Sequence, residues 1–94
     1  MNTIERPRKT LPVIVMQMDN KKDFESVMIV EMESYSSPWT PKILKKFLGT
    51  EFCIGLVAKY QGKVIGFLFY QVCKEELGLV NIAVLPCYRG HKVG

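Results

Sequence analysis

The run from Leu79 to Leu85 constrains the fold of this chain most, because almost every position in it is apolar. A strand that is apolar on both of its faces is typical of the middle of a sheet, so we expect this strand to be central. Pro86 follows directly and ends the strand, since proline cannot donate to the ladder. A sheet whose most buried strand comes last in the sequence usually needs a covering element after that strand. We therefore expect either the first part of a larger domain or a chain that completes itself through another copy.

The preceding segments supply three more expected strands. Residues 52–59 and 64–73 are rich in β-branched and aromatic side chains, and the short turn at 60–63 predicts that they form a hairpin. A polar connection over 74–78 is expected to lead into the last strand. The β-prone run at 13–18 is expected to form the first strand.

Two helices are expected between the first strand and the hairpin. Asp19 or Asn20 can cap a helix over 21–34, and Thr40 can cap a second over 41–48. One face of the first helix gathers at helical spacing Phe24, Val27, Met28 and Glu31. Its apolar surface is widened by Ile29, Val30 and Met32, which suggests contact on more than one side. The predicted order is β-α-α-β-β-β, an α+β fold with a mainly antiparallel sheet.

The N-terminus and the cysteines narrow the class of protein. Residues 1–11 are polar and basic and are expected to form a flexible leader. The chain has no run of about 18 apolar residues and no signal cleavage site, so neither a membrane span nor secretion is expected. Cys53, Cys73 and Cys87 match no metal-ligand spacing. We expect buried thiols in a cytoplasmic protein without a metal site.

The net charge of +4 is modest, with one basic cluster at Lys42, Lys45 and Lys46. A solvated helix face is one interpretation of this cluster, and a surface for nucleic acid or another acidic ligand is the other. Aromatic side chains that could stack on bases do not interleave with these lysines, so no nucleic-acid partner is expected.

A basic turn with two glycines follows the last strand. Glycine lets the backbone turn tightly and approach a ligand closely, and successive N–H groups in such a turn form a concavity that binds anions. The turn comprises Arg89, Gly90, His91, Lys92, Val93 and Gly94. A phosphate or pyrophosphate site is therefore one hypothesis, and an ordinary solvated turn is the alternative.

Three stretches in the right order resemble one enzyme family. Residues 81–89, NIAVLPCYR, resemble the stretch that leads into the cofactor loop of the GNAT N-acetyltransferases. Val30-Glu31 with Ser37-Pro38-Trp39-Thr40 resembles an element of the ribosomal-protein-alanine N-acetyltransferases, and residues 64–67, VIGF, resemble another strand of the family. The resemblance implies that residues 12–94 form the N-terminal half of a GNAT domain, ending at the pyrophosphate loop.

The same resemblance implies an activity and a site. Acetyl-CoA would be the co-substrate, and the acetyl group would pass to a primary amine, such as a protein or peptide N-terminus or a small amine. The main chain of Ile82, Ala83 and Val84 would hold the pantetheine arm and the thioester. The pyrophosphate would lie against Arg89, Gly90, His91, Lys92, Val93 and Gly94.

Some residues depart from the family or stay open. Lys92 stands where the family usually has its first loop glycine, and the catalytic acid and base are expected beyond Gly94. Glu31 and Trp39 are candidates for the substrate side of the site. The alternatives are that Glu31 is a buried acid bonded to its neighbours and that Trp39 anchors the loop between the helices. A second hypothesis is a truncated chain that binds cofactor weakly or forms a homodimer through its last strand.

Overall fold

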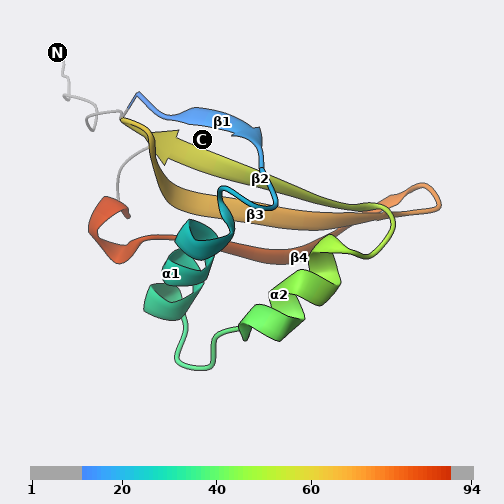
Figure 1. The fold of residues 1–94 in the computed structure, drawn as a ribbon. Coiled ribbons are helices and arrows are strands. Elements are labelled where there is room, and N and C mark those ends of the chain that lie inside the picture. Colours follow the sequence, from blue (N-terminus) through green and yellow to red (C-terminus); the bar gives the residue numbers. More distant parts are fainter. Residues whose placement is uncertain (1–11, 90–94) are drawn as a thin grey trace, which may run out of the picture.

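A computed structural model describes residues 12–89 and shows an antiparallel four-stranded sheet with two helices on one face (Figure 1). The predicted leader, 1–11, and the predicted loop residues 90–94 lie outside the described residues. The elements run in the order β1 (Ile14–Gln17), α1 (Phe24–Ser34), α2 (Pro41–Leu48), β2 (Cys53–Tyr60), β3 (Lys63–Cys73), β4 (Glu76–Val84) and a 3-10 turn (Pro86–Tyr88). This confirms the α+β class and the predicted order.

The prediction that the last strand is central is wrong for the described residues. The strand order is β1-β2-β3-β4, and β4 pairs with β3 alone. Leu77, Leu79 and Ile82 on β4 are 71%, 64% and 49% exposed. A strand that is apolar on both faces is expected to be buried. The sequence of the strand does not show, however, whether a neighbouring strand or another element covers it.

Both hairpin turns are tight. Gln61 and Gly62 have φ of 53° and 81°, which is the backbone that a two-residue turn between β2 and β3 requires, so the predicted hairpin is confirmed. The connection between β3 and β4 is shorter than the polar segment expected at 74–78. Cys73 already pairs with Glu76, because Lys74 takes a φ of 57° and turns the chain at once.

The first helix begins three residues later than expected. Asp19 Oδ1 accepts the N–H groups of Lys21 and Lys22 at 3.0 and 2.8 Å, and these bonds close a turn instead of a helix. Asp23 is buried, accepts the N–H of Asp19 at 2.8 Å and lies 3.3 Å from the ammonium of Lys59. These contacts fix the chain between β1 and α1 in a non-helical path.

The second helix matches its prediction. It spans Pro41–Leu48, and Thr40 Oγ1 accepts the N–H of Ile43 at 3.2 Å. Lys42, Lys45 and Lys46 are exposed on its outer surface. The helix therefore turns its apolar side chains, Leu44 and Phe47, towards the sheet.

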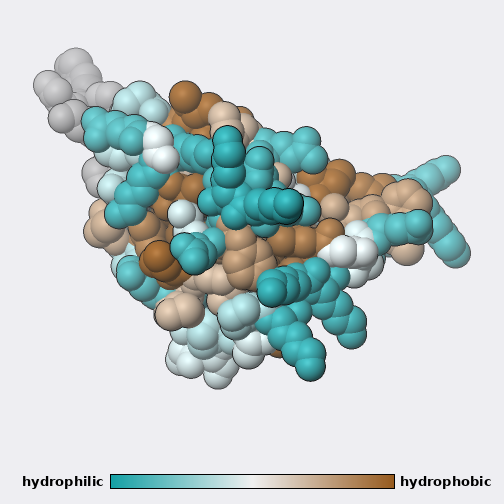
Figure 2. Space-filling model, viewed as in Figure 1, coloured by the Kyte–Doolittle hydropathy of each residue, from teal (hydrophilic) through white to brown (hydrophobic). Residues whose placement is uncertain are grey.

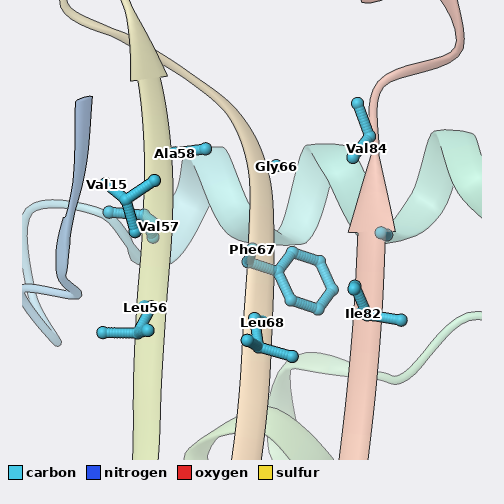
Figure 3. Close-up of a pocket in the computed structure, with 10 residues that line it drawn as sticks. Val15, Leu56, Val57, Ala58, Gly66, Phe67, Leu68, Ile82 and Val84 are labelled. Atoms are coloured by element: carbon cyan, nitrogen blue, oxygen red, sulfur yellow. The ribbon is translucent and has the colours of Figure 1, made fainter. Parts of the chain in front are cut away.

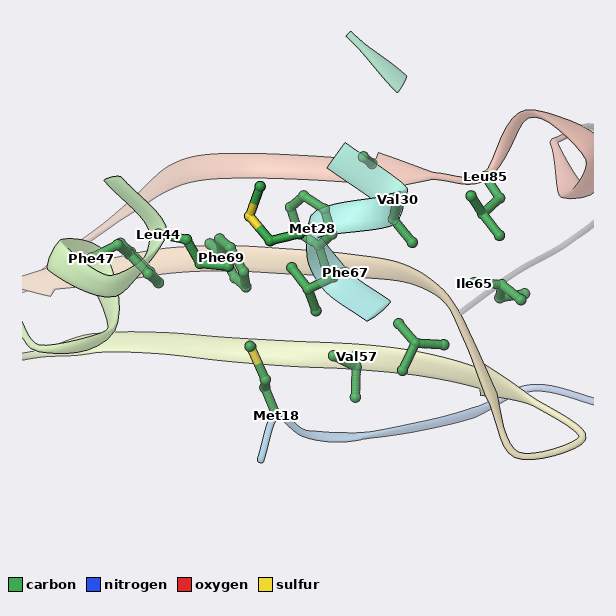
Figure 4. Close-up of a cluster of buried hydrophobic side chains, with 13 residues drawn as sticks. Met18, Met28, Val30, Leu44, Phe47, Val57, Ile65, Phe67, Phe69 and Leu85 are labelled. Carbon is green, nitrogen blue, oxygen red and sulfur yellow. The ribbon is translucent and has the colours of Figure 1, made fainter. Parts of the chain in front are cut away.

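The core lies between the two helices and the sheet (Figure 4). Its centre is Phe69 on β3, whose ring centroid lies 4.8 Å from that of Phe47 and 4.5 Å from that of Phe67. The ring centroid of Trp39, in the segment before α2, lies 5.9 Å from that of Phe69. Full burial of one such side chain contributes roughly 1.5–3 kcal/mol, so this cluster carries much of the stability.

The opposite face of the sheet carries apolar side chains, and both helices of the described residues lie on the other side of the sheet (Figure 1). Two surface hollows open on this face, and one of them is lined by Ile54, Leu68, Tyr70, Val72, Leu77 and Leu79. Figure 2, in the same view as Figure 1, shows hydrophobic residues lying among hydrophilic ones on the surface. Of the three side chains expected to widen the apolar surface of α1, Val30 is buried, whereas Ile29 and Met32 are 50% and 58% exposed.

The cysteines differ from the prediction. All three thiols are free, but Cys73 and Cys87 are exposed and Cys53 is half-buried. Cys73 lies at the β3–β4 turn, and Cys87 lies in the 3-10 turn after β4. An apolar sequence context did not predict burial, because both of these thiols lie where the chain leaves the sheet.

Candidate cofactor-binding edge of the sheet

The outer edge of β4 is set by its register with β3. Ala83 pairs with Phe67, and the N–H of Leu85 donates to the carbonyl of Ile65 at 2.8 Å. Main-chain groups alternate between the two sides of an antiparallel strand. Those of Ala83 and Leu85 therefore point towards β3, and those of Ile82 and Val84 point outward. Three residues were predicted to hold the pantetheine arm with their main chain. Ile82 and Val84 present their N–H and carbonyl groups at the outer edge of β4, and Ala83 does not.

The outward carbonyls of β4 already accept hydrogen bonds from side chains. Tyr35 Oη donates to the carbonyl of Ile82. Ser34 Oγ and Arg89 Nε donate to the carbonyl of Val84 at 3.5 and 2.8 Å. Among the described residues, no side chain accepts from the N–H groups of Ile82 and Val84. This edge thus offers donors, which suits a ligand that brings carbonyl oxygens, as a thioester and the amides of pantetheine do.

A β-bulge precedes Ile82 and Val84 in β4. The register between β3 and β4 shifts where Phe69 pairs with Asn81 and Tyr70 pairs with Leu79, so Val80 is the extra residue. A bulge bends its strand and increases the local twist. The outward groups of Ile82 therefore follow a bend in β4.

Gly66 lets β3 and β4 approach each other closely at the end of β4, where Gly66 pairs with Val84. A Cβ at this position would lie 3.0 Å from the carbonyl oxygen of Ala83 and 3.3 Å from Val84 Cγ2. Few real Cβ atoms come so near to a neighbouring atom, so a side chain here would press the end of β4 outward by a few tenths of an ångström. The glycine of the VIGF stretch thus has a local physical role.

Glu31 on α1 lies behind β4 and is 3% exposed. Its Oε1 accepts the side-chain N–H of Asn81 at 2.8 Å, and its Oε2 accepts the main-chain N–H of Trp39 at 2.8 Å. The interpretation of Glu31 as a buried acid bonded to its neighbours is confirmed. Trp39 is half-buried between Phe47 and Phe69, as an anchor of the inter-helix segment would be. A contact of either residue with substrate stays a prediction.

The predicted pyrophosphate ligands lie mostly outside the described residues. Gly90, His91, Lys92, Val93 and Gly94 are all beyond them, so their role stays a prediction. Arg89 is described and exposed, and the 3-10 turn before it packs the ring of Tyr88 at 5.8 Å from that of Tyr60. This contact directs the chain from the end of β4 towards the loop.

The other of the two hollows on the uncovered face has a volume of about 140 Å³ and an apolar lining (Figure 3). It lies over β1–β4 and is lined by Val15, Leu56, Val57, Ala58, Gly66, Phe67, Leu68, Ile82, Ala83 and Val84. None of these side chains can act as an acid, a base or a nucleophile. The chemistry that the described residues can support therefore lies at the edge of β4 and not in this hollow.

Two features of the edge had no signal in the sequence. Ser34 and Tyr35 lie about 50 residues before the strand whose carbonyls they bond.

Within residues 12–89, no group of three or more His, Cys, Asp or Glu side chains could hold a metal ion. In the same part of the chain, no helix has the length and apolar character that crossing a membrane requires.

A family profile described as "Acetyltransferase (GNAT) family" matches residues 24–94. The chain belongs to the GNAT acetyltransferase family. The family resemblance inferred from the three stretches is therefore confirmed. The described part of this GNAT chain agrees with the N-terminal half of the fold.

Curated relatives share sequence with this GNAT chain. It is 34% identical over 68 residues to the [Ribosomal protein bS18]-alanine N-acetyltransferase of Haemophilus influenzae, covering 72% of the chain and 46% of that protein. It is 28% identical over 74 residues to a putative [ribosomal protein bS18]-alanine N-acetyltransferase of Bacillus subtilis, covering 78% and 49%. The chain spans about half the length of these relatives.

Solved structures share the fold of this GNAT chain. The Escherichia coli ribosomal-protein-S18-alanine N-acetyltransferase superposes with a TM-score of 0.76 at 24% identity, covering 83% of the chain and 49% of that protein. A glucosamine N-acetyltransferase region of a fungal multi-domain β-N-acetylglucosaminidase gives 0.65 at 25% identity, covering 90% and 11%. The GNAT fold thus occurs in relatives whose names give different acceptors, a protein alanine and an amino sugar.

Proposed function

We propose that this chain provides the acetyl-CoA-binding half of an N-acetyltransferase that acts on a primary amine. The observation that supports this most is the outer edge of β4. There the N–H groups of Ile82 and Val84 face outward, while the carbonyls beside them accept from Tyr35, Ser34 and Arg89. Such an edge selects a ligand that accepts hydrogen bonds, and the thioester donor of the GNAT family is one.

These donors would assist acetyl transfer electrostatically. An N–H that points at the thioester carbonyl stabilises the negative charge that develops there when an amine attacks. The amine nitrogen forms the new bond to the acetyl carbon, the bond from that carbon to sulfur breaks, and the proton lost by nitrogen ends on sulfur. The acid and base that move this proton are expected beyond Gly94, so complete catalysis needs residues outside 1–94.

We propose a protein N-terminal amine as the acceptor. The curated relatives in Haemophilus influenzae and Bacillus subtilis carry names that specify an alanine of ribosomal protein bS18. A small amine is the alternative, because a structural neighbour carries the name of a glucosamine N-acetyltransferase. A chain extended past Gly94 should acetylate a peptide with an N-terminal alanine faster than it acetylates glucosamine. The reverse order would favour the small amine.

The test of cofactor binding uses the 94-residue chain itself. Titration with coenzyme A, followed by amide NMR, should shift the N–H signals of Ile82 and Val84 more than those of β1. Pantetheine should reproduce these shifts with lower affinity, because it lacks the pyrophosphate expected at Arg89 and residues 90–94. If no shift occurs at millimolar coenzyme A, or if the shifts are centred on another element, the proposed site is wrong.

A second candidate is a self-associating chain. Pairing of two β4 edges is opposed at Ile82 and Val84, because side chains already bond their outward carbonyls. The exposed apolar face with Leu77 and Leu79 favours packing of face on face instead. Light scattering should then show a dimer that L77K dissociates. A monomer at all concentrations, or a dimer that L77K does not affect, would reject this candidate.

A further inference from the structure

We infer that the hydrogen-bonded pair of Glu31 and Asn81 is a positioning device that aims the outer edge of β4 at its ligand. This inference rests on the proposed function and deepens it, since it names residues that act through the main chain of Ile82 and Val84. Glu31 and Asn81 touch no reacting atom in this scheme. They set where the donors lie.

The first step of the argument is that the position of the Glu31 carboxylate is strongly determined. It is 3% exposed, and each oxygen accepts a hydrogen bond of 2.8 Å, one from Asn81 and one from Trp39. Hydrogen bonds to an ionised group are short and strong, and a buried carboxylate that loses a donor keeps its full desolvation cost. The carboxylate therefore ties together α1, the segment before α2, and β4.

The second step is the place of Asn81 in its strand. It lies between the bulged Val80 and the outward-facing Ile82, and it pairs with Phe69. A bulge disrupts the ladder locally, so main-chain pairing alone holds β4 less firmly there than along a regular strand. The side-chain bond to Glu31 adds a fixed point at the position where β4 leaves the bulge.

The third step is that the same end of α1 reaches the edge again. Ser34 and Tyr35 follow Glu31 by one turn and bond the carbonyls of Val84 and Ile82. A carbonyl and an N–H of one residue share a direction at the strand edge. Any movement of α1 against β4 would therefore turn the free N–H groups of Ile82 and Val84 as well.

The primary test compares N81L with L44A. Leucine matches asparagine in size and leaves Glu31 Oε1 without its donor. Leu44 is a buried residue of α2, a helix that packs mainly on β2. N81L should lower the affinity for coenzyme A at least tenfold and lose the ligand-induced shifts of Ile82 and Val84. In the free protein, N81L should also shift these two amide signals. L44A should lower thermal stability but keep both the affinity and the shifts at a temperature where it is folded.

A rescue experiment separates positioning from stability and also covers an N81L variant that fails to fold. N81D places two carboxylates face to face and should weaken coenzyme A binding at least tenfold. Adding E31Q to N81D restores a donor and an acceptor between the two side chains, so the double variant should bind within about threefold of the original chain. E31Q alone should also bind nearly normally, because the amide of Asn81 can rotate to accept.

The outcomes distinguish the two levels of proposal. If the original chain binds coenzyme A, and N81L and N81D bind it equally well with unchanged shifts at Ile82 and Val84, the positioning role is wrong and the proposed function stands. If N81D binds coenzyme A weakly and the added E31Q does not restore binding, the hydrogen bond between the two side chains is not the cause of the loss. The inference then fails. If the original chain shows no binding, the proposed function and this inference both fail.

Discussion

The side chain of Arg89 folds back along the end of β4, where its Nε donates a 2.8 Å hydrogen bond to the carbonyl of Val84. The two residues are five positions apart in the chain, and a 3-10 turn lies between them. The same carbonyl accepts a longer bond from Ser34 Oγ at 3.5 Å. Arg89 therefore joins the edge of the sheet to the start of the predicted pyrophosphate loop, with its charge at the surface.

Removal of this charge should weaken binding of the pyrophosphate. We expect R89A to lower the affinity for coenzyme A about tenfold, because a charged hydrogen bond is worth about 1.5 kcal/mol or more. Isothermal titration at two salt concentrations measures the effect and should show a smaller salt dependence in R89A. The matched control is K46A, which removes the same charge from the exposed side of α2. Equal affinities of R89A and K46A would contradict a phosphate contact at Arg89.

A side chain at Gly66 should push β4 away from β3. We expect G66A to destabilise the chain by about 1–3 kcal/mol, because its Cβ would meet the Ala83 carbonyl at 3.0 Å and the backbone has to move. Urea unfolding measures the loss. G78A is the control on the same pair of strands, since its nearest neighbour would be Gln71 O at 3.9 Å. If G66A is as stable as G78A, β4 does not depend on this close approach.

Loss of the Tyr35 hydroxyl should release an edge carbonyl. Y35F keeps the ring and removes the bond to the carbonyl of Ile82, so we expect a loss of about 1 kcal/mol in the free energy of unfolding. Hydrogen exchange of the amides near Ile82 should also become faster. Unchanged stability and unchanged exchange in Y35F would show that this contact does not hold α1 against β4.

Acid should weaken the turn before α1. The N–H groups of Lys22 and Lys21 bond Asp19 and hold the pKa of its carboxyl below the ordinary value of 3.8. A lowered pKa in the folded state means that ionised Asp19 stabilises the fold above about pH 3.8, and that this contribution is lost as the pH falls through the lowered pKa.

Nuclear magnetic resonance titration of the Asp19 carboxyl measures this effect directly. The midpoint should lie below 3.8 in the folded chain. D19N keeps one acceptor oxygen, so its unfolding midpoint should change less between about pH 5 and about pH 2 than that of the original chain. A carboxyl midpoint at or above 3.8 would contradict the two hydrogen bonds.

Features set by neighbouring residues were predictable from the sequence. Thr40 and Pro41 start α2 where the capping rule places the start, and Gln61-Gly62 forms the expected turn. The start of α1 was wrong, because Asp19 and Asp23 bond to nearby main chain and to Lys59 rather than cap a helix at Lys21. Several local signals compete in that segment, and a tertiary ion pair takes part in the result.

By itself, the sequence determined the α+β class and the order of elements. It also determined the family, through three short stretches whose residues are neighbours in the chain. Only the tertiary structure decided that β4 lies at the edge of the described sheet, and that Ile82 and Val84 rather than Ala83 face outward. It also decided that Glu31 bonds Asn81, 50 residues away, and that Tyr35 bonds Ile82, 47 residues away. The physical reason is that strand register and the packing of α1 bring these groups together, and neither is encoded in the residues next to them.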